Sequence, residues 1–472
     1  MFELHHLTAA EQLDWLRRGK VTPVELATHY LDRIERLDAG LGAFTTVTRD
    51  AALQRAEHVQ QHVPKSAPLW GLPVGDKDLW RRTGVRSMMG SRLFADLVPD
   101  ASDEIVVALE EAGSVSLGKT NAPEFGLSSY SESLVAPAAR TPWDVALGAG
   151  GSSGGAAVAV SAGLLPVAPG SDGGGSIRIP AAATGLVGLK PSRGRVPSLG
   201  GFLSLGGLVT AGPLARTVAD AALLLDALAG PSPWSVGPPS WDGGAYLNAA
   251  VRGEGRYQIG VMTTSPWDTS YDITVSPEAL AAMDTALHGL DALGHGIEEF
   301  GLEPDDSYGP AFRTIWQAGA AGIPAEGEEQ LDLLEPLTRW LVGRGRQLGA
   351  RDLAGALQQL AVYERSVIRQ FASYDAVLTP ALALTPRPVG WYDAVDPERN
   401  FEQQCQYTPW TSFVNVSGLP AITLPVAQTD EGLPMGVQLI GRPGGEHTLL
   451  AIGAQLERRF AWQSRHPEAW RA

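Results

Sequence analysis

Short apolar runs alternate with longer helical stretches from about residue 68 onward. The runs at residues 72–74, 115–117, 164–167 and 186–189 are rich in Val and Leu and are bounded by Gly or Pro, as buried strands are. Between them, residues 105–112 and 218–228 carry apolar side chains at helical spacing. Alternation of this kind predicts an α/β sandwich.

A segment rich in Pro, Gly and Trp interrupts this alternation at residues 230–255 and is typical of a long surface connection. It is a candidate domain boundary, but strand-like and helical stretches resume after it, for example at residues 259–262 and 278–293. A chain of 472 residues with 44% hydrophobic side chains has no difficulty in forming a core. We therefore expect one domain over residues 1–472.

Charge and cysteine content limit the classes of function. There are 36 basic and 52 acidic side chains, a net charge of -16, which argues against a nucleic-acid binder driven by phosphate neutralisation. The single cysteine, Cys405, cannot form an internal disulfide. No apolar stretch reaches the 18 residues of a membrane span. The sequence thus predicts a soluble, cytoplasmic protein with neither nucleic-acid nor membrane partners.

One segment matches the phosphate-binding loop in its letters: Gly113-Ser-Val-Ser-Leu-Gly-Lys-Thr. Such a loop follows a strand and opens a helix, so that backbone amides surround the phosphates. Here a helical stretch precedes Gly113, a strand fills the variable positions and Pro123 follows soon after. A nucleotide-binding protein using residues 113–120 therefore remains only an alternative class, which predicts ATP binding that is lost in Lys119→Ala.

The histidines give no metal site. His58 and His62 have helical ligand spacing, but they lie in a polar stretch without a third ligand, so a solvated helix face is the simpler interpretation. His5 and His6 carry no recognisable context. We expect neither a metal nor another cofactor.

Two glycine-rich segments contain serines: Gly148-Ala-Gly-Gly-Ser-Ser-Gly-Gly and Gly170-Ser-Asp-Gly-Gly-Gly-Ser-Ile-Arg-Ile-Pro. Glycines often serve only to make turns. Three consecutive glycines before Ser176, however, allow backbone N–H groups to converge on an anion, as in an oxyanion hole.

Ser152 also fits the nucleophile elbow Gly-x-Ser-x-Gly, which needs a strand before it and Asp and His partners after it. The preceding segment is a poor strand. The downstream histidines stand in no special context; they are His288, His295, His447 and His466. A Ser-His-Asp enzyme is therefore the weaker alternative.

A lysine is the other candidate base. The chain has five lysines beside 31 arginines, and only lysine can lose its proton. Lys77 ends an apolar run, where burial would lower its pKa toward the neutral form. Pairing of Lys77 with Asp76 or Asp78 is the alternative without a catalytic role.

These segments resemble the amidase signature family. In that family a lysine in Gly-Leu/Ile-Pro-x-x-x-Lys-Asp and serines in two Gly-rich segments form a Ser-Ser-Lys triad, and all three segments occur here in order, with the two serines 24 residues apart. Further matches extend over nearly the whole chain, among them residues 117–121, 374–380 and 415–440. The resemblance implies a three-layer α/β/α sandwich around a large mixed, twisted β-sheet, with a catalytic core at about residues 68–230.

The resemblance also implies roles for residues. Lys77, Ser152 and Ser176 would be the catalytic base, the bridging serine and the nucleophile, with a cis peptide bond at Ser152. The N–H groups of Gly173, Gly174, Gly175 and Ser176 would form the oxyanion hole. Three residues would support the site: Ser153, Asp172 and Arg178.

The resemblance implies hydrolysis of a linear or cyclic carboxamide through an acyl-enzyme, by a monomer or homodimer. The sequence around Ser176, together with the later Ser192-Arg-Gly-Arg, is similar to that of the family branch related to 6-aminohexanoate-cyclic-dimer hydrolases. A glutaminase component of a tRNA-dependent amidotransferase is the alternative. Specificity would come from residues of about 300–415, where the four tryptophans 316, 340, 391 and 410 are candidates for an apolar pocket, or for core packing.

Overall fold

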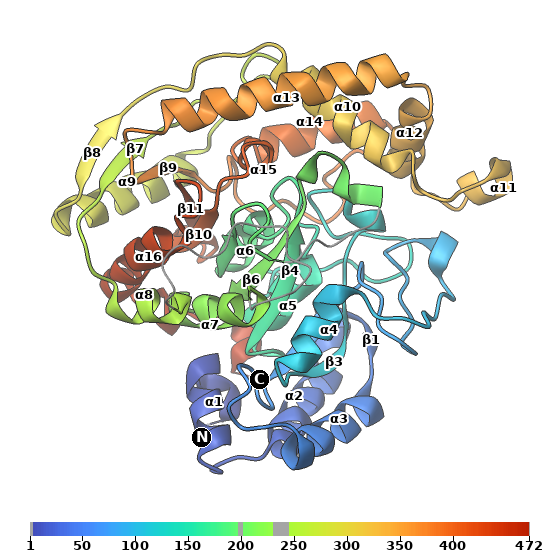
Figure 1. Cartoon of the computed structure of the whole chain (residues 1–472), viewed down its shortest axis with the longest axis vertical. Helices are drawn as coiled ribbons and strands as arrows, with labels where there is room; N and C mark the ends of the chain where they lie inside the picture. The colour runs from blue at the N-terminus through green and yellow to red at the C-terminus, as the bar shows by residue number, and fades with distance from the viewer. Residues whose placement is uncertain (1–2, 197–201, 230–244, 472) are drawn as a thin grey trace.

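The computed structural model describes residues 3–196, 202–229 and 245–471 (Figure 1). Its centre is an eight-stranded mixed sheet with the order β4-β6-β5-β10-β11-β9-β7-β8, and a three-stranded sheet has the order β1-β3-β2. The strands are β1 Phe44–Val47, β2 Pro73–Lys77, β3 Val115–Thr120, β4 Val167–Asp172, β5 Val187–Lys190, β6 Thr210–Ala215, β7 Gln258–Val261, β8 Gly296–Glu299, β9 Ala376–Pro380, β10 Ala421–Gln428 and β11 Pro434–Gly441.

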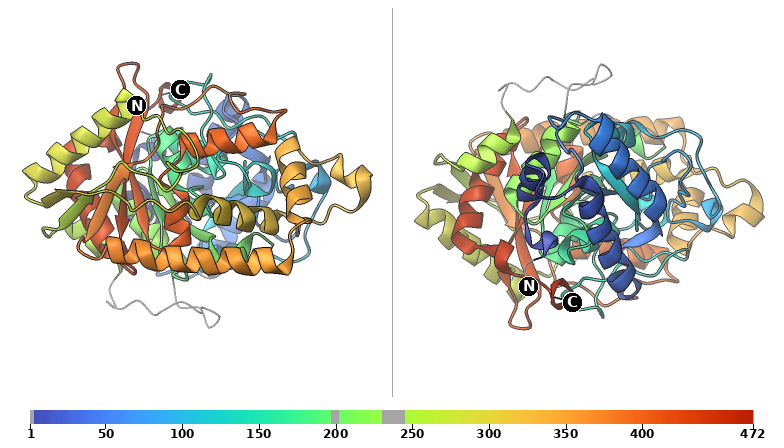
Figure 2. Two further views of the ribbon diagram at one scale, coloured as in Figure 1. Left: turned by 90° about the horizontal axis from the view of Figure 1, so that it is seen from above. Right: turned by 90° about the horizontal axis from the view of Figure 1, so that it is seen from below.

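Helices cover both faces of the large sheet. The helices are α1 Ala9–Arg17, α2 Pro23–Leu37, α3 Arg49–His62, α4 Glu104–Glu111, α5 Gly154–Ser161, α6 Arg178–Thr184, α7 Val218–Leu228, α8 Tyr246–Arg252, α9 Pro277–Ala292, α10 Tyr308–Ala320, α11 Gly327–Leu331, α12 Pro336–Gly345, α13 Ala350–Gln370, α14 Pro397–Tyr407, α15 Ser412–Val416 and α16 Glu446–Phe460. One layer holds α7, α8, α9 and α16, and the other holds α5 and α6, with α10, α13 and α14 beyond them (Figure 1 and Figure 2). The predicted three-layer α/β/α fold is confirmed.

The large sheet contains both antiparallel and parallel strand pairs. Strands β4, β6, β5, β10, β11 and β9 pair antiparallel, whereas β7 is parallel to both β8 and β9. In the small sheet β2 is parallel to β3, and β2 also lies beside β4 of the large sheet. The ends of β2 and β4 are therefore brought together, and these are the strands that carry the predicted catalytic segments.

Helices α2 and α3 pack against the small sheet, and α1 and the chain ends lie at the same end of the molecule (Figure 2). α1 and α2 begin at capping boxes formed by Thr8 with Glu11 and Thr22 with Glu25, as the Ser/Thr-x-x-Glu pattern predicts. His5 contacts the backbone carbonyl of Trp470 at 3.1 Å, so the beginning and end of the chain meet there. No helix within the described residues is both long enough and apolar enough to pass through a bilayer.

Two element predictions need correction. The strand expected at residues 164–167 is β4, which runs later, from Val167 to Asp172, because Leu164 still belongs to the turn after α5. The predicted surface connection at residues 230–255 lies partly outside the described residues, and its last part contains α8.

The segment that matches a phosphate-binding loop has the wrong structure for one. α4 precedes Gly113, and β3 includes Gly118, Lys119 and Thr120, so no helix begins at this loop. The Lys119 ammonium is buried and donates to the backbone carbonyl of Trp80. The Lys119 ammonium is therefore hydrogen-bonded inside the core and is not available to bind a phosphate.

Candidate active site

Strand geometry separates Lys77 from its acidic neighbours. Successive side chains of β2 point to opposite faces, so Asp76 faces away from the Lys77 side chain, and Asp78 follows the end of the strand. Asp76 pairs with Arg82 at 2.5 Å, and Asp78 lies 3.8 Å from Lys119. The alternative that Lys77 is neutralised by either aspartate is therefore wrong.

Lys77 is instead surrounded by serines. Its Nζ donates to the hydroxyls of Ser152 at 2.8 Å, Ser153 at 2.9 Å and Ser171 at 2.9 Å, and it also contacts the Ser171 carbonyl at 3.3 Å. Its side chain is fully buried, and no ion pair within the described residues includes it. Neutral hydroxyls therefore form the immediate environment of this amine.

This environment favours the neutral amine. Burial lowers the pKa of Lys77 to about 7, although the negative charge of Asp172 acts in the opposite direction. Because the ordinary pKa of a lysine is about 10.4, an amine with this lowered pKa is a competent proton acceptor near neutral pH. Lys190 has a similar pKa of about 7, again through burial, but its Nζ donates to the Pro191 carbonyl and, among the described residues, to no serine.

Ser152 and Ser153 lie at the start of α5, a short apolar helix whose residues are all buried. The peptide bond between Gly151 and Ser152 is cis, as the family resemblance predicts. A side chain at Gly151 would meet the Tyr130 backbone at 2.6 Å, which explains the glycine before the serine. The Ser153 N–H donates to the Ser176 carbonyl at 3.1 Å and thereby joins the two glycine-rich segments.

Ser176 lies between β4 and α6 and is 7% exposed, so its hydroxyl is accessible from a pocket. Ser152 lines the same pocket. Among the described residues no hydrogen bond joins the Ser152 and Ser176 hydroxyls. Hydrogen bonds of this kind often form only when substrate is bound.

A second buried cluster holds the Ser176 loop. The Asp172 carboxylate accepts from Arg178 through two N–H groups, at 2.8 and 2.9 Å, and from the backbone N–H of Gly175 at 2.7 Å. Burial by itself would raise the pKa of Asp172, but the charge and hydrogen bonds of Arg178 hold it well below its usual range. Asp172 is therefore ionised and fully paired.

The Gly175 N–H is thereby excluded from an oxyanion hole, which corrects one prediction. A backbone N–H has one hydrogen, and that of Gly175 is donated to Asp172. Gly175 instead shapes the loop: its φ is 133°, and a Cβ there would lie 2.5 Å from the Thr411 hydroxyl. Among the described residues we find no acceptor for the N–H groups of Gly173, Gly174 and Ser176.

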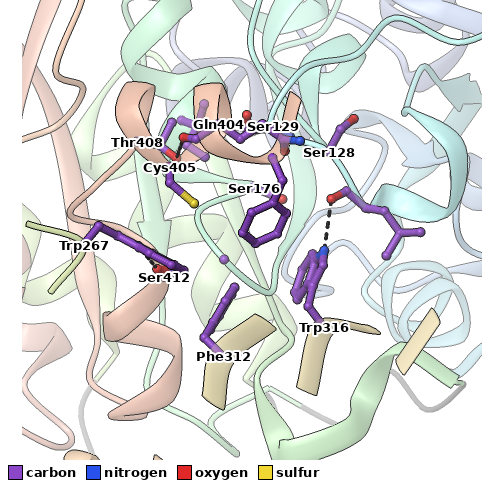
Figure 3. Close-up of a pocket in the computed structure, with 14 residues that line it drawn as sticks. Ser128, Ser129, Ser176, Trp267, Phe312, Trp316, Gln404, Cys405, Thr408 and Ser412 are labelled. Atoms are coloured by element: carbon purple, nitrogen blue, oxygen red, sulfur yellow. Dashed lines mark hydrogen bonds between the residues drawn. The ribbon is translucent and has the colours of Figure 1, made fainter. Parts of the chain in front are cut away.

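Two pockets meet at Ser176. We call the first the aromatic pocket; it is lined by Leu127, Ser128, Ser129, Gly174, Ser176, Ile179, Trp267, Phe312, Trp316, Phe401, Gln404, Cys405, Thr408 and Ser412 (Figure 3). We call the second the Ser152 pocket; it is lined by Leu79, Trp80, Phe125, Gly126, Ser152, Ser171, Gly173, Ser176, Val209 and Trp316. Only Ser176 and Trp316 belong to both linings.

Trp316 is the one predicted pocket tryptophan that lines these pockets. Its indole stacks on Phe312 and donates to the Leu127 carbonyl at 3.2 Å, which fixes the ring (Figure 3). Trp410 is fully buried in the core, Trp391 packs against Tyr392, and Trp340 is partly buried between two apolar clusters.

The nucleophile-elbow alternative finds no support. Within the described part of the chain no strand leads directly into Ser152, because the preceding strand, β3, ends at Thr120, and none of the four downstream histidines lines either pocket. His447, for example, packs against Tyr246, and His466 stacks on Trp470.

The structure adds residues that sequence analysis missed. Ser171 accepts from Lys77, while Asn415 and Gln438 accept from Arg178 at 2.6 and 2.7 Å. Ser171 and Asn415 stand inside the matching segments, so position in these segments was the available signal. Away from the site, Glu3, His5 and His29 place three potential ligand atoms within 4.8 Å of one another.

Comparison with known proteins agrees with this geometry. The model of the Amidase family matches residues 25–450. AmiB2 of Mycobacterium tuberculosis, a provisionally named amidase, is 38% identical, with 97% of each chain covered. One glutamyl-tRNA(Gln) amidotransferase subunit, from Moorella thermoacetica, is 34% identical, with 99% of each chain covered. The chain therefore belongs to the amidase family.

A solved structure gives the same result. The structure of 6-aminohexanoate cyclic dimer hydrolase complexed with substrate superposes with a TM-score of 0.90 at 29% identity, covering 99% of this chain and 100% of the other. The predictions of the amidase signature family and of an amide-hydrolysing enzyme acting on C–N bonds are confirmed.

Proposed function

We propose that this amidase acts through Lys77, Ser152 and Ser176, with Ser176 as the nucleophile. The observation that carries the proposal is the Lys77 amine, which is buried, has no acidic partner among the described residues and lies 2.8 Å from the Ser152 hydroxyl. A buried lysine without an acidic partner contributes no ion pair to the fold. Its neutral amine is, however, suited to accept a proton from a serine hydroxyl.

The steps follow from this arrangement. Neutral Lys77 accepts the Ser152 proton, and Ser152 accepts the proton of Ser176 as the Ser176 oxygen attacks the amide carbonyl. The backbone N–H groups of Gly173, Gly174 and Ser176 stabilise the oxyanion. The C–N bond breaks, and the amine leaves with a proton returned through Ser152. Water then hydrolyses the acyl-enzyme ester and releases the acid.

Ser153 and Arg178 support these steps without reacting. Ser153 holds the Lys77 amine through its hydroxyl and the Ser176 backbone through its N–H. Arg178 fixes Asp172, which in turn fixes the loop before Ser176.

The test is mass spectrometry of the protein and its peptides after treatment with a broad fluorophosphonate probe. We expect a single adduct on Ser176 that is absent in Lys77→Ala. An adduct on Ser152 alone would favour the nucleophile-elbow alternative. Labelling of Ser176 that persists in Lys77→Ala would exclude a lysine base.

The 34% identity to an amidotransferase component supports a second candidate, a glutaminase that works inside a complex. This candidate predicts weak glutaminase activity alone and copurification with a partner. The leading candidate is a stand-alone hydrolase of small linear or cyclic amides, supported by the likeness to a cyclic dimer hydrolase.

We also propose one domain, because one apolar cluster runs from Ala9 in α1 to Trp462 after α16. The free, buried Cys405 fits a cytoplasmic enzyme. We propose a monomer or homodimer without nucleic-acid or membrane partners, which native mass spectrometry tests.

A further inference from the structure

Only one of the two pockets is lined by Ser152, the residue that transfers protons in the proposed mechanism. Ser152 lines only the Ser152 pocket, and Gly174 lines only the aromatic pocket. In the proposed mechanism Ser152 returns a proton to the leaving nitrogen, so this nitrogen must lie next to Ser152. The amine part of the substrate then extends into the Ser152 pocket, and the acyl part extends into the aromatic pocket on the other side of Ser176.

Neither lining contains a charged side chain. No Lys, Arg, Asp, Glu or His appears among the residues that line the two pockets. A charged substrate group placed there would lose its hydration without gaining an ionic partner, which is strongly unfavourable. Asp172 and Arg178, which hold the Ser176 loop, are buried and paired with each other.

The polar groups of the aromatic pocket are already engaged. The Ser412 hydroxyl contacts the Trp267 indole at 3.0 Å and the Tyr308 hydroxyl at 2.7 Å. The Gln404 side chain accepts from the Ser129 N–H and donates to Asn400. Burial raises the pKa of the Cys405 thiol, so it is neutral. What remains for a ligand is mainly the faces and edges of aromatic rings.

The Ser152 pocket is also uncharged and mostly apolar, and fewer residues line it. Its polar side chains are Ser152, Ser171 and Ser176, of which the first two accept hydrogen bonds from Lys77. Its other members are apolar or glycine, with Leu79, Trp80 and Val209 among them. Both pockets therefore offer a ligand mainly apolar surface.

We infer that the substrate is a neutral amide with an apolar group on both sides of the C–N bond, the acyl group binding in the aromatic pocket and the amine group in the Ser152 pocket. This inference rests on the proposed function and specifies its substrate class. It disfavours free glutamine, whose ammonium and carboxylate groups would lie in the uncharged aromatic pocket.

The first test compares three amides with the unmodified enzyme. Phenylacetanilide is apolar on both sides, phenylacetylglycine carries a carboxylate on its amine side, and glutamine carries both charges on its acyl side. We expect kcat/KM for phenylacetanilide to exceed that for either charged amide by at least about 100-fold. Equal rates, a preference for a charged amide, or no hydrolysis of phenylacetanilide would overturn the inference.

The second test assigns the two sides with a matched pair of substitutions. Val209→Phe adds a ring to the Ser152 pocket, and Cys405→Phe adds the same ring to the aromatic pocket. The measured quantity is the ratio of kcat/KM for phenylacetanilide to that for phenylacetamide, which releases only ammonia. Val209→Phe should lower this ratio by at least about tenfold, whereas Cys405→Phe should lower both rates and keep the ratio within about threefold. The opposite pattern would reverse the assignment and contradict the inference.

Fluorophosphonate labelling of each protein separates this inference from the proposed function. Absence of a probe adduct on Ser176 in the unmodified enzyme would contradict the proposal that Ser176 is the nucleophile. Normal labelling together with the wrong substrate preference would contradict only the substrate class.

Discussion

Two buried polar clusters flank Ser176, and they are built in opposite ways. Around Arg178, all five guanidinium N–H groups find acceptors: two contact Asp172, and the others contact Thr411, Gln438 and Asn415. Around Lys77, the acceptors are serine oxygens and the amine has no carboxylate partner among the described residues. Burial is nearly complete in both clusters.

This difference separates positioning from chemistry. A paired charge with all its hydrogen bonds satisfied is fixed in one geometry and one protonation state, as a scaffold requires. A buried amine among neutral hydroxyls can lose its proton at little cost, as a base requires. The substitutions below should therefore affect stability at one cluster and rate at the other.

The largest effect is expected at Lys77. Lys77→Met removes the base but keeps an unbranched chain, and we expect kcat/KM to fall by about 10³-fold or more with a native circular dichroism spectrum. Lys77→Arg is the matched control, because arginine keeps a positive charge but cannot accept a proton, so it should be as inactive. Activity above a tenth of normal in Lys77→Arg would show that Lys77 acts only through its charge.

At Arg178 we expect a loss of stability. Arg178→Met leaves Asp172 buried without its partner, and breaking a buried pair in this way costs about 3–5 kcal/mol in the free energy of unfolding, measured with urea. The double substitution Asp172→Asn with Arg178→Met removes both charges and should recover part of that loss. An unchanged unfolding midpoint in Arg178→Met would mean that the cluster does not hold the loop.

The rate should depend on pH through Lys77. Its pKa is lowered to about 7 by burial, and the neutral amine is the active form, so kcat/KM should fall as pH decreases through about 7 and level off above it. Well below the pKa the fall approaches about tenfold per pH unit. With chemistry limiting, a flat profile from pH 5 to 9 would contradict a lysine base.

The smallest effect is expected at Lys190, which is buried like Lys77 but donates to no serine in the part of the chain that the structure describes. Lys190→Met should keep kcat/KM within about threefold of normal. The substitution should instead change stability: the unfolded chain retains this proton up to the ordinary lysine pKa, whereas the folded chain loses it near pH 7, so the contribution of Lys190 to stability rises with pH between these values. Lys190→Met should therefore flatten the melting temperature against pH in this range. A large loss of rate would show that burial alone does not distinguish the two lysines.

The elements and the central residues of the site could be predicted because their signals are local. Helix caps such as Thr22 with Glu25, and the spacing from Ser152 to Ser176, stand within short segments of the sequence. The partners of Arg178 could not be predicted in this way, since Asn415 and Gln438 reach it from more than 200 residues away and only the folded sheet brings them together. The engagement of the Gly175 N–H likewise depends on a carboxylate orientation that no pattern specifies.

Trp316 belongs to the linings of both pockets, and its indole is held by Phe312 and the Leu127 carbonyl. Most other lining residues belong to one pocket and come from different parts of the chain, with α14 serving only the aromatic pocket and Val209 only the Ser152 pocket. On the inferred assignment of the two pockets, substitutions in one lining should change the preference for the acid with little effect on the preference for the amine, and the reverse. A substitution of Trp316 should alter both pockets, because this side chain contacts both. A library that randomises the two linings separately should therefore keep Trp316 constant.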